Sequence, residues 1–80
     1  MPRFYFDVAE THGLVKDKEG ILLPNASAAI AEARLSARDF AIEGLRDSTP
    51  VGKRKLIVRD HHGKTLFECS VKEVVDELMA

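Results

Sequence analysis

The chain has 80 residues, of which 45% are hydrophobic and 31% charged, and its net charge is −1 at pH 7. This length allows one small domain, and the composition is that of a folded globular protein rather than a disordered or fibrous one. A near-neutral charge excludes a general basic field that would attract nucleic acid or an anionic membrane. With one cysteine, no leader pattern and no apolar run near the roughly 20 residues that span a bilayer, we expect a single cytoplasmic domain over residues 1–80 and no membrane partner.

The first two predicted elements form a hairpin. Residues 3–10, RFYFDVAE, alternate apolar side chains on one face with Tyr5 and Asp7 on the other, which is the period of a half-buried strand. The stretch THG at residues 11–13 predicts a turn. Residues 14–24 then continue as an extended segment that breaks near Asp17 to Gly20.

A long helix is predicted from Ala26 to about Arg46, with Asn25 at its N-cap. Small residues dominate one stripe of this helix, which consists of Ala26, Ala29, Ile30, Ala33, Ala37, Phe40, Ala41 and Gly44. Small side chains let a helix lie close to a sheet. We therefore expect the large groups of that interface to come from the first strand, chiefly Phe4 and Phe6.

Two apolar residues, Leu35 and Ile42, lie seven positions apart on the opposite side of the same helix. They could be covered by the C-terminal segment of the same chain or by the same helix of a second copy across a twofold axis. Isolated apolar residues are also commonly exposed. We predict a homodimer with Leu35 and Ile42 in its interface.

The C-terminal part predicts a second hairpin and a short helix. Residues 55–60 and 64–70 are rich in β-branched and aromatic residues and are joined by HHG. Ser70 followed by Glu73 is a capping-box pattern that opens a final helix. The order is β-β-α-β-β-α, an α+β fold in which one long helix covers one face of an antiparallel sheet.

One phrase, V-[KR]-D-x-x-G-x-x-L, occurs twice, at residues 15–23 and 58–66. Its aspartate can accept hydrogen bonds from backbone donors two residues on, its glycine can adopt a left-handed conformation, and two polar residues occupy the corner. In the second copy these corner residues are His61 and His62. The residues predicted to form the two structural turns are Asp17, Gly20, Asp60 and Gly63.

Catalytic and metal chemistry find little support in the sequence. His61 and His62 would need further ligands, and neither His12 nor Cys69 stands at a recognised ligand spacing. Cys69 lies on a predicted strand face, where an unbridged cysteine usually acts as a small apolar group. We therefore expect no catalytic residue, no cofactor and no metal, and we keep a minor metal or enzymatic role at His61 and His62 as an alternative.

The basic residues Lys53, Arg54, Lys55 and Arg59 form the one local cluster that could contact phosphate. Aromatic side chains for base stacking are missing from this cluster. Contact with nucleic acid through residues 53–59 is therefore an alternative that we do not favour.

Several stretches together resemble a family of short bacterial proteins described only as a domain of unknown function. They are the opening MPRFYFDV, the segment GLVKDKEGILLPNASAAIAEA and the later KLIVRDHHGKTLF. The resemblance supports the fold boundaries and implies no activity. A looser, architectural likeness is to antitoxin domains of the HicB type, although fold does not fix function. We predict a small non-catalytic binding or regulatory module.

Overall fold

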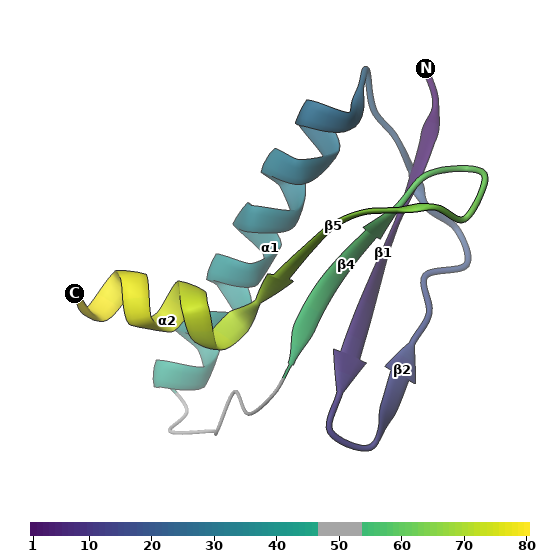
Figure 1. Ribbon diagram of the computed structural model, residues 1–80. Coiled ribbons are helices and arrows are strands. Elements are labelled where there is room, and N and C mark those ends of the chain that lie inside the picture. Colours follow the sequence, from purple (N-terminus) through teal and green to yellow (C-terminus); the bar gives the residue numbers. More distant parts are fainter. Residues whose placement is uncertain (47–53) are drawn as a thin grey trace.

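The computed structural model describes residues 1–46 and 54–80, and these form an α+β domain with an antiparallel sheet (Figure 1). Its elements are β1 (Arg3–Glu10), β2 (Gly13–Val15), β3 (Ile21–Leu22), α1 (Ala26–Arg46), β4 (Lys55–Arg59), β5 (Thr65–Ser70) and α2 (Val71–Met79). The predicted fold class and order of elements are confirmed. The second predicted strand is divided into β2 and β3 by the segment at residues 16–20.

The sheet has the order β2-β1-β4-β5, and β3 pairs with β1 beyond the end of β2. Thus β1 has two short neighbours on one side, paired at Val8↔Val15 and Phe4↔Ile21, and the whole of β4 on the other. All of these pairs are antiparallel. Between β4 and β5 the register shifts next to Arg59. The sheet therefore ends in a divided edge at β2 and β3 and in a single strand, β5, at the other edge.

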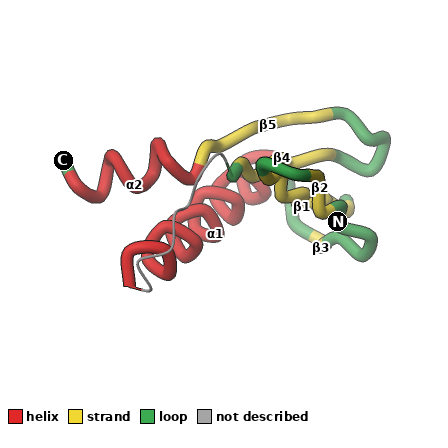
Figure 2. Tube along the Cα trace, turned by 90° about the horizontal axis from the view of Figure 1, so that it is seen from below, coloured by secondary structure: helices red, strands yellow, loops and turns green. Residues whose placement is uncertain are grey.

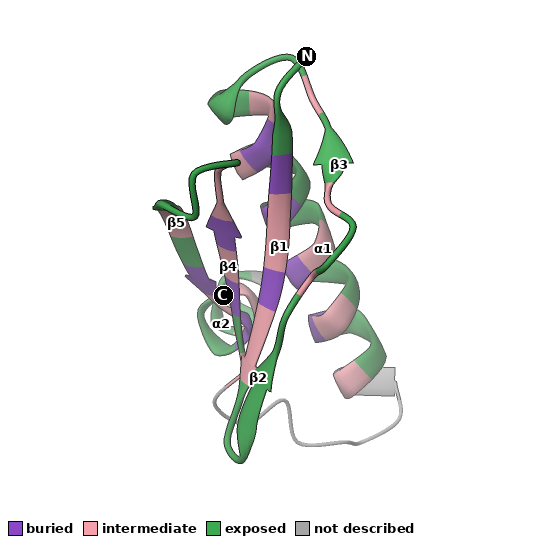
Figure 3. Ribbon diagram, turned by 90° about the vertical axis from the view of Figure 1, so that its right-hand side faces the viewer, coloured by how far each residue is buried: buried purple, intermediate pink, exposed green. Residues whose placement is uncertain are grey.

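Helix α1 lies against one face of the sheet, behind β1 in Figure 3. It begins as predicted, because the Asn25 Oδ1 accepts a hydrogen bond from the Ala28 N–H at 2.9 Å. The alanine stripe is the contact surface, and its four members with no exposed area are Ala29, Ala33, Ala37 and Ala41. The first three of them pack against buried side chains of the sheet, namely Phe4, Leu56, Val58 and Cys69. Small helix residues and larger strand residues thus share the core, with β4 contributing as much as β1.

Helix α2 follows β5 directly and leaves the sheet on the same side as α1 (Figures 1 and 2). Ser70 is its N-cap, but the Ser70 side chain makes no capping hydrogen bond. The predicted capping box is therefore not formed. Instead, the first helical N–H, that of Val71, donates to the Arg54 carbonyl oxygen at 3.0 Å, because β4 begins beside it with Lys55 paired to Ser70. Val71 is fully buried and Val74 packs against the core.

The outer side of α1 remains open in the described part of the chain. Leu35 is 57% exposed and Ile42 is 39% exposed, so α2 does not cover either residue. Of the helices described, none has the length and apolar character needed to cross a membrane.

Candidate functional site

A groove of about 590 Å³ lies between α1, β5 and α2. Its apolar surface includes Leu35 from α1, Phe67 from β5 and Val74 from α2. The predicted interface residue Leu35 is thus part of the groove wall, whereas Ile42 lies two turns further along α1 and outside the lining. The groove lies beside the β5 edge of the sheet.

The two helical walls of this groove carry opposite charges. Arg34 and Arg38 line it from α1, and Glu73 and Glu77 line it from α2. The Arg34 guanidinium lies over the Phe67 ring, 5.0 Å from its centroid. No ion pair joins the two walls among the described side chains. The groove therefore presents a basic row and an acidic row on either side of an apolar surface.

Cys69 lines the same groove but is only 7% exposed. Burial raises the pKa of its thiol, and the nearby carboxylates of Glu73 and Glu77 act in the same direction against the opposing charge of Arg34. The Sγ donates a weak hydrogen bond to the Ser70 carbonyl oxygen at 3.8 Å. A protonated, packed thiol fits a core residue, because nucleophilic chemistry needs the thiolate.

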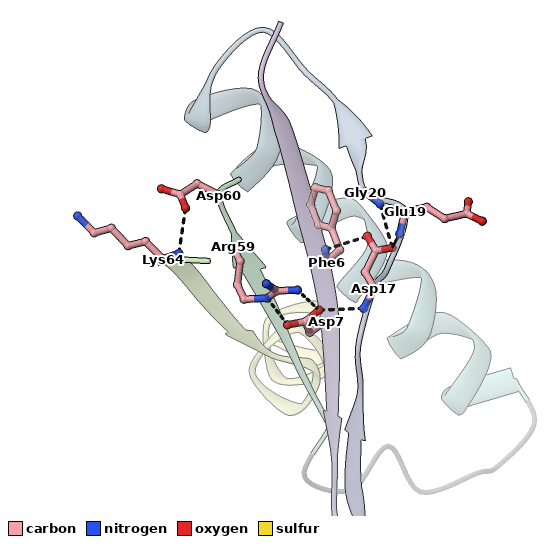
Figure 4. Close-up of polar contacts among 8 residues, drawn as sticks. All are labelled: Phe6, Asp7, Asp17, Glu19, Gly20, Arg59, Asp60 and Lys64. Atoms are coloured by element: carbon pink, nitrogen blue, oxygen red, sulfur yellow. Dashed lines mark hydrogen bonds and ion pairs between the residues drawn. The ribbon is translucent and has the colours of Figure 1, made fainter. Parts of the chain in front are cut away.

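On the opposite face of the sheet, Asp7 and Arg59 form an ion pair between β1 and β4 (Figure 4). The Asp7 Oδ2 accepts from the Arg59 Nε at 2.5 Å, and the Asp7 Oδ1 accepts from Nη2 at 3.1 Å. The Arg59 guanidinium also lies 5.2 Å from the centre of the Tyr5 ring. Asp7 is 2% exposed although neither α1 nor α2 packs on this face. The Asp7 side chain is buried by Arg59 and by the segment at residues 16–20.

That segment is fixed to β1 by a second carboxylate, as Figure 4 shows. The Asp17 N–H donates to the Asp7 Oδ1 at 2.9 Å, and the Asp17 Oδ2 accepts from the Phe6 N–H at 3.1 Å. The other oxygen, Oδ1, accepts from the N–H groups of Glu19 and Gly20. The side chain of Asp17 thereby replaces the strand backbone that would otherwise pair with β1 between β2 and β3.

These contacts lower the pKa of both carboxyl groups. Burial by itself raises the pKa of Asp7, but the hydrogen bonds from Arg59 and the Asp17 N–H, with the charge of Arg59, outweigh it and lower the pKa. Burial also raises the pKa of Asp17, and its three backbone donors reverse that effect and lower the pKa. Both groups are held as carboxylates, which makes them structural acceptors rather than proton donors.

The two copies of the repeated phrase share a turn geometry but differ in their surroundings. Gly20 and Gly63 have φ values of 70° and 84°. In the second copy the Asp60 Oδ1 accepts from the N–H groups of His62 and Lys64, each at 2.9 Å. Hydrogen bonding to the Lys64 N–H is the main cause that lowers the pKa of Asp60. Gly63 has open space around it, whereas a Cβ on Gly20 would lie 2.8 Å from a carbonyl oxygen of β1.

The described residues of the predicted phosphate-binding cluster do not gather on one face of the sheet. Lys53 lies outside the described residues. Arg54 contacts Glu10 at 3.6 Å and lies over the Phe40 ring on the helical side of the sheet. Arg59 is on the opposite face and is paired with Asp7, and Lys55 is exposed on that same face by its register. Two of these cations are thus already matched by carboxylates.

His61 and His62 occupy the exposed tip between β4 and β5, with their ring centroids 3.9 Å apart. In the segments 1–46 and 54–80, no three or more histidine, cysteine or acidic residues converge in a way that could hold a metal ion. Neither histidine makes a side-chain hydrogen bond within these segments. Their rings therefore have no positioned partner for acid–base or metal chemistry in the described part of the chain.

A family model for a domain of unknown function, DUF6894, matches residues 3–72 of the chain. The chain belongs to the DUF6894 family. The DUF6894 match begins with β1 and ends at the second residue of α2, so it contains every described strand, α1 and the turns at Gly20 and Gly63. The acidic wall of the groove at Glu73 and Glu77 lies beyond it. Comparisons with curated proteins and with solved structures gave no match.

The sequence indicated the groove residue Leu35 but not the ion pair. Asp7 was expected only to face away from the aromatic side of β1, which it does. A charged residue at the centre of a strand is a signal for a buried partner, because an unpaired charge is costly there. Its partner Arg59 was assigned to the basic cluster, and only the register Asp7↔Ile57 brings these two side chains together.

Proposed function

We propose that this protein is a small non-catalytic binding or regulatory module that acts as a homodimer, with the groove between α1, β5 and α2 in its interface. The observation that supports this most directly is Leu35, a large apolar side chain that is 57% exposed at the rim of an apolar groove. Burial of such surface is the main favourable contribution to association.

The charges of the groove favour a second copy as its occupant. A twofold interface brings the same surface of each copy together, so this surface must be complementary to itself. A basic row at Arg34 and Arg38 beside an acidic row at Glu73 and Glu77 meets this condition, because rotation places each row opposite the unlike row of the partner. An occupant of uniform charge would be repelled by one of the two walls.

A non-catalytic role is supported by the state of the candidate chemical groups. The carboxylates of Asp7 and Asp17 are saturated with donors, and the Cys69 thiol is buried with a raised pKa. The nucleic-acid alternative gains no support from Arg54 and Arg59, which already face carboxylates. A titration with DNA and RNA at low and moderate salt would show a steep salt slope if that alternative were correct.

The homodimer is tested by light scattering of Leu35→Asp. The chain offers a matched control in Leu14→Asp, because Leu14 is 55% exposed, close to the 57% of Leu35, but lies on β2 at the far edge of the sheet. We expect wild type and Leu14→Asp to be dimers and Leu35→Asp to be a monomer of unchanged secondary structure. A wild-type monomer, or a dimer that persists in Leu35→Asp, would contradict the proposed interface.

The contact between unlike walls is tested by charge exchange. Arg38→Glu and Glu77→Arg should each weaken the dimer, since each brings like charges together across the twofold axis. Mixing the two variants should restore dimers, because both contacts then join unlike charges. The acidic α1 of one variant meets the basic α2 of the other, and the second contact keeps the native pairing of Arg38 with Glu77. If the two walls interacted only within one chain, mixing would restore nothing.

A further inference from the structure

The groove runs along the free edge of β5. Phe67, Glu68 and Cys69 are consecutive, and successive side chains of a strand point to opposite faces of the sheet. A hollow on one face would contact alternate residues, yet all three line the groove. The edge of the strand therefore borders it, and no other described strand pairs with β5 on that side.

The two edges of the sheet differ in how far they are protected against pairing. At one edge, β2 has three residues and β3 has two, with the segment at residues 16–20 between them. Short, interrupted edge strands are a common protection against the addition of another strand. At the other edge, β5 has six residues, contains no proline, lysine or glycine, and pairs regularly with β4 from Phe67 to Ser70. The β5 edge is thus the one that can accept a further strand.

We propose that the second copy of this chain binds by pairing its β5 antiparallel with β5, which joins the two sheets into one. This inference rests on the proposed homodimer and specifies its geometry. Antiparallel pairing is the arrangement that a twofold axis perpendicular to the sheet gives to identical strands, and it continues the antiparallel pattern of the sheet. The exposed backbone groups of each β5 gain partners on the other copy.

This pairing agrees with the charges on both sides of the edge. The joined sheet carries both α1 helices on one face, since α1 and α2 of each copy lie on one side of the sheet (Figure 2). We therefore expect the grooves of the two copies to face each other, with a basic and an acidic wall from each copy at the contact. On the open face, a register centred on Glu68 would place two carboxylates opposite each other, which is unfavourable. The axis is therefore expected at a neighbouring residue of the helical face, Phe67 or Cys69, which keeps the two faces continuous.

Inter-copy distances test the pairing, with spin labels at Glu68→Cys or at Leu14→Cys, each in a Cys69→Ala background. Paired β5 strands are about 4.8 Å apart, whereas the order β2-β1-β4-β5-β5-β4-β1-β2 separates the two β2 strands by seven spacings, about 34 Å. Labels at residue 68 should therefore show strong dipolar broadening, and labels at residue 14 should show a long distance.

A dimer with a short distance at residue 14, or with long distances at both positions, would overturn the strand pairing and leave the homodimer in place. If a labelled chain is monomeric while wild type is dimeric, hydrogen exchange of the unmodified protein tests the strand pairing instead. The outward amides of Phe67 to Ser70 should exchange more slowly as the concentration rises through the dimer transition, and those of Gly13 to Val15 should not change. Unchanged β5 amides in a proven dimer would also overturn the pairing, and a monomer at all concentrations overturns both proposals.

Discussion

Replacement of Asp7 by alanine should destabilise the domain more than any other single change to a charged residue described above. The Asp7 side chain is 3% exposed and that of Arg59 is 18% exposed, so the substitution leaves a guanidinium without its carboxylate in a largely dry position. Breaking a buried pair in this way costs about 3–5 kcal/mol. It also leaves the Asp17 N–H without its acceptor. A chain of 80 residues has a total stability of about 4–12 kcal/mol, so Asp7→Ala should remove a large fraction of it.

The control for this prediction is Glu10→Ala on the same strand. Glu10 and Arg54 are 3.6 Å apart, but their side chains are 46% and 33% exposed. Such pairs contribute at most about 1 kcal/mol and are screened by salt. Urea unfolding followed by circular dichroism should therefore show a loss for Asp7→Ala several times that for Glu10→Ala. Equal losses would show that the Asp7–Arg59 pair behaves as a surface pair, and the reasoning would be wrong.

The Asp7–Arg59 pair also makes the stability of the fold depend on pH in the acidic range. The pKa of Asp7 in the folded state lies below its ordinary value of 3.8, so the folded chain binds fewer protons than the unfolded chain in that range. The stabilisation is complete above pH 3.8 and is lost as the pH falls through the lowered pKa. Asp7→Ala should lack this part of the acid dependence, and urea midpoints measured from pH 6 down to pH 2 would reveal it. A wild-type stability that is flat over this range would contradict the prediction.

Three further predictions concern the turns and the thiol. Gly20→Ala should lower the free energy of unfolding in urea more than Gly63→Ala does. A left-handed alanine costs about 1–2 kcal/mol at either position, but only at Gly20 does the new Cβ also clash with the backbone of β1. Equal losses for the two variants would contradict this. Replacing His61 or His62 by alanine should change stability by less than about 0.5 kcal/mol, and a loss as large as that of Gly63→Ala would restore a chemical role for these residues. Cys69 should react with a disulfide reagent at least about tenfold more slowly in the native chain than in urea, since its thiol is buried with a raised pKa; similar rates would show that the groove exposes it.

The local pattern was sufficient for the elements and insufficient for the contacts between them. The alternation in residues 3–10 and the alanine spacing from Ala26 predicted β1 and α1, because both periods are properties of a single element. The break near Asp17 was also visible in the sequence. Its cause was not, because the Asp17 carboxylate bonds to the Phe6 N–H, eleven residues away in the chain.

In the candidate site, too, the sequence pattern predicted a property of a single element but not the contacts between elements. Leu35 was singled out by its position opposite the alanine stripe, which depends on helix geometry alone. The charged walls of the groove depend on the direction in which α2 leaves β5, and this direction is set when the Val71 N–H meets the Arg54 carbonyl oxygen. The pair between Asp7 and Arg59 spans 52 residues and requires the register of β1 on β4, which a period of two leaves open.

The division of one sheet edge into β2 and β3 has a consequence for how many copies can assemble. If these two strands were one continuous strand, a pair joined at β5 would still offer a free edge at each end, and further copies could add without limit. The segment at residues 16–20, held by Asp17, removes that possibility by keeping the outer strands too short to act as a template. The carboxylate that closes a turn in one chain would then also fix the stoichiometry at two and keep the protein from forming fibres.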